Sequence, residues 1–248
     1  MVEIVLWKPL YYVSIAMFAL SLLAYPFSQT FSVVMILVLV SVWSKIPGYV
    51  HFVFNKLAMN DLFTFIVGAY LGGLAGGLFG AFVVLFGRIF GVNEYVPYTI
   101  RCAIGLFVAG MLAPFAVSVA GGVNINALFI FEGIFYALYY TMVFLFAKDE
   151  ISLEAGLLPF VVFFDFVLNA TWLGSFGGAI NNLMLNGISS GWTFIVFAGI
   201  ILGFIALARN GGKLAGYITA KMHKEENASD EESLLKRLES AKKARVTV

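Results

Sequence analysis

A glycine-rich apolar stretch between Asp61 and Arg88 constrains the fold of this chain more than any other feature. Its sequence is DLFTFIVGAYLGGLAGGLFGAFVVLFGR, with no charged residue between the two ends. Four of its glycines recur every four residues: Gly68, Gly72, Gly76 and Gly80. In a helix they form one smooth face on which a neighbouring helix can pack closely. The GGLAGG cluster at 72–77 is also where a helix breaks most easily. The stretch is therefore either one glycine-faced helix or a bent pair, with the glycines serving close packing or gating.

The low charge of the chain indicates a membrane protein. Of its 248 residues, 61% are hydrophobic and 12% are charged, which is too little polarity to cover the surface of a soluble domain. We predict an all-α, polytopic transmembrane helical bundle in the cell membrane, surrounded by the lipid bilayer. Cys102 is the only cysteine, and His51 and His223 lie far apart, so we expect no disulfide, metal site or cofactor. We also expect no nucleic-acid partner.

About six full spans are predicted beside the glycine stretch. They are 9–25, 28–43, 99–120, 126–147, 155–175 and 192–208. A cleaved signal peptide is the competing interpretation of the first one, because Lys8 precedes an apolar run. Glu3 and the interfacial Trp7 favour a membrane-anchored helix instead. The predicted membrane domain covers 1–210, and 211–248 form a cytoplasmic tail.

The distribution of Lys and Arg discriminates between a straight and a bent glycine stretch. The tail holds 8 of the 15 Lys and Arg residues, and the first 210 residues hold the other 7. With the tail in the cytoplasm, a single crossing at 61–88 puts Lys8, Lys45 and Lys56 outside, against the positive-inside rule. If the stretch enters and returns, all 7 lie inside and both termini are cytoplasmic. The external segments are then 25–28, 120–126 and 176–190, which lack Lys and Arg. We therefore favour a bend near 72–77.

A second glycine-interrupted stretch is predicted at 173–191. It would give the chain a faint internal repeat, in which each half has two full spans followed by a broken pair. Asp61 opens the first broken region, and Asp165 lies just before the second. Broken segments at corresponding places in two halves point to a transporter site.

Polar side chains inside the predicted spans are the candidate solute-binding residues. A carboxylate such as Glu132, within ALFIFEGIFYALYY, is costly in a membrane and usually faces the bundle interior. Asp165 and Asn169 lie one helical turn apart on one face, and Trp172 continues that face. Asn181, in the second interrupted stretch, either meets a ligand or satisfies freed backbone groups. These five residues form the predicted substrate-binding set.

Each of these residues also has a structural interpretation. Glu132 can pair two helices or stay protonated, and Asp165 with Asn169 can join helices through hydrogen bonds. Arg101, near the start of its span, either pairs with a carboxylate or extends to the lipid headgroups. The chain contains no HExxH motif, no DGxxAR motif and no Cys–His arrangement, so we predict that it is not an enzyme.

The tail contains a predicted amphipathic helix at 229–245. Ser229 and Glu232 fit a capping box, and Leu234, Leu235 and Leu238 follow at helical spacing. The helix is suited to dock on a membrane or cytoplasmic partner subunit, or to lie on anionic lipid. An uninvolved, solvated tail is the alternative.

From the glycine stretch through the span with Arg101 to Leu168-Asn169, the chain resembles the S-components of energy-coupling-factor vitamin transporters. The rod-shape-determining membrane protein family is similar as well. The first resemblance implies a small helical bundle that captures a solute and associates with a coupling subunit. The first span, SIAMFALSLLAY, lacks the AxxxA docking motif of that family. We expect a small-solute-binding transport subunit or permease, with a non-transporting scaffold that recruits a partner through its tail as the alternative.

Overall fold

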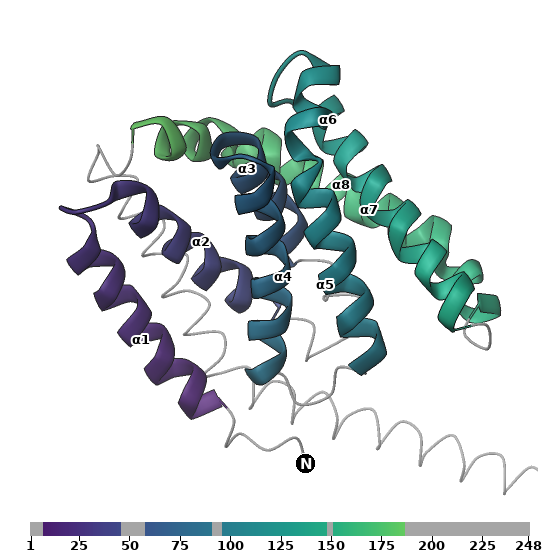
Figure 1. Cartoon of the computed structure of the whole chain (residues 1–248), viewed down its shortest axis with the longest axis horizontal. Coiled ribbons are helices and arrows are strands. Elements are labelled where there is room, and N and C mark those ends of the chain that lie inside the picture. Colours follow the sequence, from purple (N-terminus) through teal and green to yellow (C-terminus); the bar gives the residue numbers. More distant parts are fainter. Residues whose placement is uncertain (1–6, 46–57, 91–95, 148–150, 187–248) are drawn as a thin grey trace, which may run out of the picture. The chain divides into compact units, whose positions relative to one another are not determined.

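All regular structure in the described part of the chain is helical. In the computed structural model, the described residues are 7–45, 58–90, 96–147 and 151–186. The helices in these ranges are α1 (Trp7–Ala24), α2 (Gln29–Ser44), α3 (Asn60–Leu71), α4 (Gly73–Phe90), α5 (Val96–Met111), α6 (Ala113–Ala120), α7 (Ile125–Phe146) and α8 (Ile151–Asn186) (Figure 1). The predicted all-α fold class is confirmed for these residues.

Helices α1 and α2 form an antiparallel pair joined by serine side chains. Ser32 Oγ donates to the Ser21 carbonyl oxygen at 2.7 Å, and Ser21 Oγ donates to the Ser32 carbonyl oxygen at 3.0 Å. Farther from the turn, Trp43 Nε1 donates to Ser14 Oγ at 2.7 Å. Ser28 caps α2 by accepting a hydrogen bond from the backbone N–H of Phe31. The helices predicted at 9–25 and 28–43 are present.

The glycine stretch folds back on itself at Gly72. This residue has φ +96° and ψ 159°, a conformation that is essentially restricted to glycine, and it separates α3 from α4. A Cβ on Gly76 would collide with the backbone of Gly68, and one on Gly80 would lie 2.7 Å from Thr64 Cγ2. Both contacting pairs are equidistant from Gly72 in sequence, so α3 and α4 form an antiparallel hairpin. The bend lies within the stretch where the charge pattern favours one.

Helix α4 uses the same small residues to approach α5. A Cβ on Gly110 would lie 2.5 Å from the carbonyl carbon of Gly76, and one on Gly77 would lie 2.6 Å from the Phe107 carbonyl oxygen. Since these would be contacts with backbone, larger side chains would force the helices apart. The glycines thus bring the backbones of α3, α4 and α5 together.

The segment predicted as one span at 99–120 is broken in the structure. Helix α5 ends at Met111, α6 starts at Ala113, and the two are bent by 47°. Pro114 lies in the first turn of α6, where its missing N–H breaks no intrahelical hydrogen bond. The predicted span at 99–120 is therefore a bent pair of helices, because the proline begins a new helix instead of lying inside one.

The predicted interruption of the second glycine-rich stretch is wrong over 173–186, where α8 is a continuous helix. The helix continues without a break through Gly174, Gly177 and Gly178 to Asn186. A glycine costs a helix only about 1 kcal/mol relative to alanine, and burial of Ile180 and Leu183 contributes enough to offset that cost. The predicted internal repeat therefore has no second break at 173–186, and the remainder of the stretch, 187–191, lies outside the described residues.

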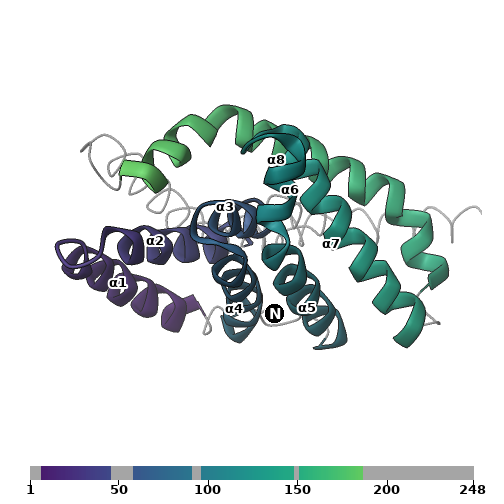
Figure 2. The same ribbon diagram turned by 45° about the horizontal axis from the view of Figure 1, so that its top comes forward.

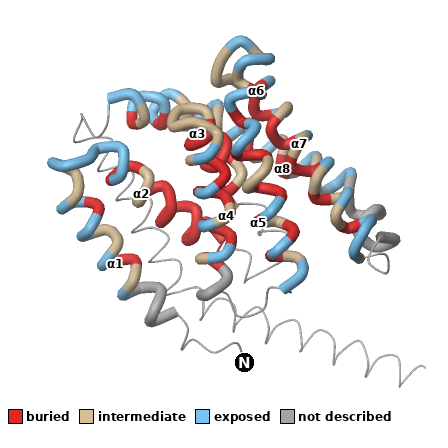
Figure 3. The backbone as a smooth tube through the Cα atoms, viewed as in Figure 1, coloured by how far each residue is buried: buried red, intermediate tan, exposed pale blue. Residues whose placement is uncertain are grey.

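The core lies where α3 meets its neighbours. All residues of α3 from 62 to 68 are buried (Figure 3). Phe65 contacts Phe131 of α7, with ring centroids 5.5 Å apart. Helix α7 matches the span predicted at 126–147, and Asn124 caps it. Helix α8 runs past α7 and on across the end of α3 in both ribbon views (Figures 1 and 2). This arrangement places the second half of α8 next to the hairpin turn.

One helix in the described residues, α7, is both long and apolar enough to cross a bilayer. The bent pair of α5 and α6 is a second one if it is counted as a single span. Shorter apolar helices lie at Tyr12–Ala24, Gln29–Ser44 and Gly73–Gly87. The count of six spans stays a prediction. The span at 192–208 and the tail with its helix at 229–245 lie outside the described residues.

Candidate functional site

Two polar contacts join α7 to α8 inside the protein. Asn169 Nδ2 donates a hydrogen bond to Glu132 Oε1 at 2.7 Å. One turn away, the Tyr136 hydroxyl donates to Asp165 Oδ2. The Glu132 side chain is 0% exposed, and the other three side chains are also buried. We call these four residues the α7–α8 polar seam.

The seam follows from helical spacing on two antiparallel helices. Glu132 and Tyr136 are four residues apart on α7, as are Asp165 and Asn169 on α8, so each pair occupies one face. Because the helices run in opposite directions, the first residue of each pair meets the second residue of the other. Phe166 packs against this face, with its ring centroid 6.3 Å from that of Tyr136. An apolar surrounding of this kind strengthens the hydrogen bonds that it encloses.

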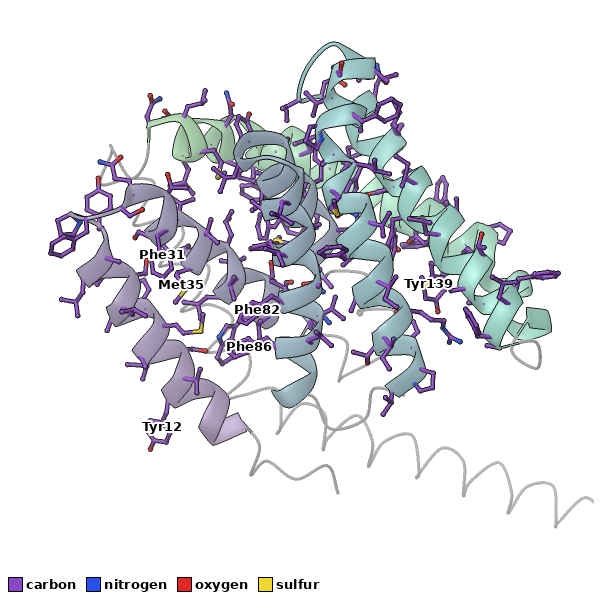
Figure 4. All side chains as sticks on the ribbon, viewed as in Figure 1. Tyr12, Phe31, Met35, Phe82, Phe86 and Tyr139 are labelled. Atoms are coloured by element: carbon purple, nitrogen blue, oxygen red, sulfur yellow. The ribbon has the colours of Figure 1, made fainter. Side chains whose placement is uncertain are left out.

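Arg101 is buried against aromatic rings near the seam. Its guanidinium carbon lies 5.7 Å from the centroid of the Tyr139 ring, a cation–π geometry. Tyr139 projects from α7 (Figure 4). The Tyr98 ring meets the same ring edge-on, with centroids 5.9 Å apart. The Arg101 side chain is 6% exposed, so it packs among the helices and does not extend away from them. Its pairing with a carboxylate stays a prediction.

An open pocket of about 550 Å³ adjoins the seam. Three segments that are distant in sequence enclose it: the end of α3, the turn before α7 and the second half of α8. The lining residues are Tyr70, Val123, Asn124, Ile125, Ala170, Leu173, Gly174, Gly177, Gly178 and Asn181. Ala170 directly follows the seam residue Asn169, so one turn of α8 contributes to both features. The volume lies in the range of small-molecule sites.

Hydrogen bonds fix the walls of this pocket. The Tyr70 hydroxyl donates to Asn181 Oδ1 and so joins the hairpin to α8. Asn124 Oδ1 accepts hydrogen bonds from the backbone N–H groups of Asn126 and Ala127, at 2.9 Å and 3.0 Å. Its Nδ2 donates to the Ala120 carbonyl oxygen at 3.1 Å. The pocket therefore has a prearranged wall on each side.

Comparisons with known proteins leave the geometry as the basis for function. No protein-family model, curated protein or solved structure matches this chain. The resemblance to vitamin-transporter S-components and to rod-shape-determining membrane proteins stays a prediction. No group of three or more His, Cys, Asp or Glu residues that could hold a metal ion occurs in the ranges that the structure describes.

Four of the five predicted binding residues lie in the seam or the pocket. Glu132, Asp165 and Asn169 lie in the seam, where their side chains are hydrogen-bonded to other protein groups, and Asn181 lines the pocket. Trp172 stacks on Phe176, with ring centroids 5.3 Å apart, and does not line the pocket. The glycines at 68, 76 and 80 lie in the hairpin interface, and Gly72 forms its turn.

Three residues of the seam and pocket, Tyr70, Asn124 and Tyr136, are not among the predicted site residues. Tyr136 carried a usable signal, since it is four residues from Glu132 and so shares its helical face. Asn124 also carried one, because an Asn just before an apolar run is a typical N-cap. Tyr70 carried none, because only the fold brings it to Asn181, which is 111 residues away.

Proposed function

We propose that this chain is an integral membrane protein that binds a small solute in the pocket between α3, α7 and α8. It would act as a transport subunit or permease. Its termini would lie in the cytoplasm, and the pocket would open to the opposite side of the cell membrane.

The distribution of apolar and polar side chains supports a membrane setting. Several large apolar side chains point outward, with Phe27 90%, Phe146 81% and Leu23 70% exposed. At the same time Glu132 and Arg101 are buried. Large exposed apolar surfaces are rare in soluble monomers, whereas intramembrane charges usually face the bundle interior. A bilayer would cover the outward apolar surface.

The position of the pocket is the observation that carries the proposal. Its lining comes from the hairpin end at Tyr70, from residues 123–125 and from α8 up to Asn181. Residues 123–125 and the last part of that α8 wall belong to the segments that lack Lys and Arg, 120–126 and 176–190. In the bent topology both are external, as is the hairpin turn beside Tyr70. One pocket formed by three external segments is suited to capture a solute from outside.

The seam has a different role in this proposal. Its two carboxyl groups are hydrogen-bonded to Asn169 and Tyr136, so they hold α7 against α8 beneath the pocket. We therefore assign contact with the solute to the pocket lining, and assign Glu132, Asp165 and Asn169 to keeping its two walls in place.

Filling the pocket tests the proposal. A Cβ on Gly178 meets no atom within 4 Å, so Gly178→Leu should occupy the pocket without disturbing packing. Gly133 on α7 has the same open surroundings and does not line the pocket, which makes Gly133→Leu the matched control. Purified protein is heated with each compound of a panel of small metabolites, and the unfolding temperature is measured.

A solute present at 100 times its dissociation constant adds about 2.7 kcal/mol of stability. We expect at least one compound to raise the unfolding temperature of the unaltered chain and of Gly133→Leu, but not of Gly178→Leu. An equal shift in all three proteins would place the binding site elsewhere.

A membrane scaffold is the second candidate function. The observation that favours it is the seam, because hydrogen-bonded carboxyl groups are what a purely structural role for Glu132 and Asp165 requires. Under this alternative, deleting 225–248 abolishes function, and both Glu132→Gln and Gly178→Leu leave it intact.

A further inference from the structure

We propose that the pocket selects an uncharged solute that carries an amide-type edge, with a hydrogen-bond acceptor beside a donor, on a flat apolar body. This inference rests on the proposed function, because it names the class of solute that the same pocket takes. Three features of the lining support it.

The first feature is the charge of the wall. No Asp, Glu, Lys, Arg or His is among the residues that line the pocket. A charged ligand that leaves water needs an opposite charge or several donors to replace its hydration. The start of α7 does not supply them, because Asn124 already accepts from the N–H groups of Asn126 and Ala127. An ion would therefore lose more hydration free energy on entering the pocket than its contacts with this wall would replace.

The second feature is the pair of hydrogen-bonding groups at Asn181 and Tyr70. The Tyr70 hydroxyl gives its proton to Asn181 Oδ1, so its oxygen is left to accept a hydrogen bond. With its oxygen occupied, Asn181 offers the two N–H donors of Nδ2. One donor and one acceptor, held together by a direct contact, match a ligand edge that carries a carbonyl next to an N–H group.

The third feature is the bare backbone of α8. Added Cβ atoms on Gly174 and Gly178 meet nothing within 4 Å, so this wall is open along one helical face. Leu173 and Ile125 supply apolar surface around it. A planar ring can lie against Gly174 and Gly178, because neither residue has a side chain that would project into the pocket.

Three probes of nearly equal shape test whether the pocket selects an uncharged solute. Benzamide is neutral and carries the amide edge, benzoate is its anionic counterpart, and benzamidine is its cationic counterpart. Binding of each probe to the purified full-length chain is measured by saturation-transfer NMR. The signal that remains in Gly178→Leu is subtracted as non-specific uptake by detergent, and Gly133→Leu again serves as the control.

We expect a pocket-dependent signal for benzamide and none for the two ions. A pocket-dependent signal that is stronger for benzoate or benzamidine would overturn the uncharged class, while leaving a solute pocket in place. The absence of a pocket-dependent signal for all three probes would overturn this inference. If the metabolite panel also gave no pocket-dependent shift in unfolding temperature, the proposed function would be contradicted as well.

Asn181→Asp provides the sharper test because it preserves shape and adds one negative charge. Asn181 is exposed, so the variant should fold. We expect roughly tenfold weaker binding of benzamide, through loss of the Nδ2 donors, and the appearance of pocket-dependent binding of benzamidine. If Asn181 had only a structural role, this substitution would not change the preference of the pocket from benzamide to benzamidine. Unchanged selectivity in this variant would contradict the assignment of Asn181.

Discussion

At the scale of single residues, the hydrogen bond between Asn169 and Glu132 should be one of the most sensitive points in the bundle. Asn169→Ala removes a donor to Glu132 Oε1 where water cannot replace it, because Glu132 is 0% exposed. We expect a loss of about 1–3 kcal/mol in the free energy of unfolding. Glu132→Gln keeps an acceptor at the same place and should cost less. Denaturant unfolding followed by circular dichroism measures both.

Asn182→Ala is the matched control for that prediction. Asn182 Oδ1 accepts from Asn186 Nδ2 at 2.6 Å, so the donor is again an Asn amide, but this bond lies on the exposed surface of α8. Water replaces this bond, so the change should stay within about 0.5 kcal/mol. A loss for Asn169→Ala as small as the one expected for Asn182→Ala would show that this seam hydrogen bond adds nothing to stability.

At this scale, the sequence identified the buried polar residues but not the side chains to which they are hydrogen-bonded. Glu132, Asp165 and Asn169 stood out because polar groups in apolar helices are costly, and all three are buried and hydrogen-bonded. Helical spacing correctly put Asp165 and Asn169 on one face. Their partners depend on which helix lies opposite, and one sequence does not contain that information.

At the scale of helices, the turn between α3 and α4 should depend on Gly72. No atom lies within 4 Å of a Cβ placed there, so Gly72→Ala would not clash, but its backbone conformation is restricted to glycine. We expect a cost of about 1–3 kcal/mol in thermal unfolding. Gly72→Asn should cost at least as much, because Asn tolerates the left-handed helical region but not this one.

Gly121 is the control for that prediction. It also has a positive φ, of +73°, but with ψ 19° it lies in the left-handed helical region at the end of α6. Asn is common at such positions, so Gly121→Asn should change stability by only a few tenths of a kcal/mol. If Gly72→Asn were tolerated equally well, the hairpin would not depend on the backbone of Gly72.

The two glycine-rich stretches show what local pattern can and cannot predict about helices. At 72–77 the positive-inside argument added information from the whole chain, and the bend lies there. At 173–191 only composition supported a break, and α8 continues through Gly174, Gly177 and Gly178. The difference is in packing, because Gly68 and Gly76 touch each other, whereas Gly174 and Gly178 face open space. Close backbone approach, not glycine content, marks the hairpin.

At the scale of the whole molecule, the hairpin turn and the turn before α7 lie on the same side of the helices. The α3–α4 hairpin means that the start of α3 and the end of α4 share one side, while its turn lies on the other. The turn before α7 is on the side of the hairpin turn, because Tyr70 and Val123 line one pocket. This arrangement agrees with the sidedness that the distribution of Lys and Arg predicts.

Cysteine labelling of intact cells tests that sidedness directly. On a Cys102→Ala background, single cysteines are introduced by Ser28→Cys, Val123→Cys, Ala58→Cys and Val96→Cys, and an impermeant thiol reagent is applied. We expect labelling of Ser28→Cys and Val123→Cys only, because these sites precede α2 and α7, on the side of the hairpin turn. Val96 is 53% exposed, so its protection in intact cells would reflect the membrane and not burial in the protein.

Permeabilising the cells supplies the control, since Ala58→Cys and Val96→Cys should then react as well. Labelling of Ala58→Cys in intact cells, with Val96→Cys protected, would mean that the chain crosses the bilayer between them, contrary to a hairpin that enters and returns. Labelling of Val96→Cys together with protection of Val123→Cys would reverse the orientation, and the pocket would then open to the cytoplasm. Capture of a solute from outside requires the first outcome, because Tyr70, Val123 and Asn181 must be reachable from the same side.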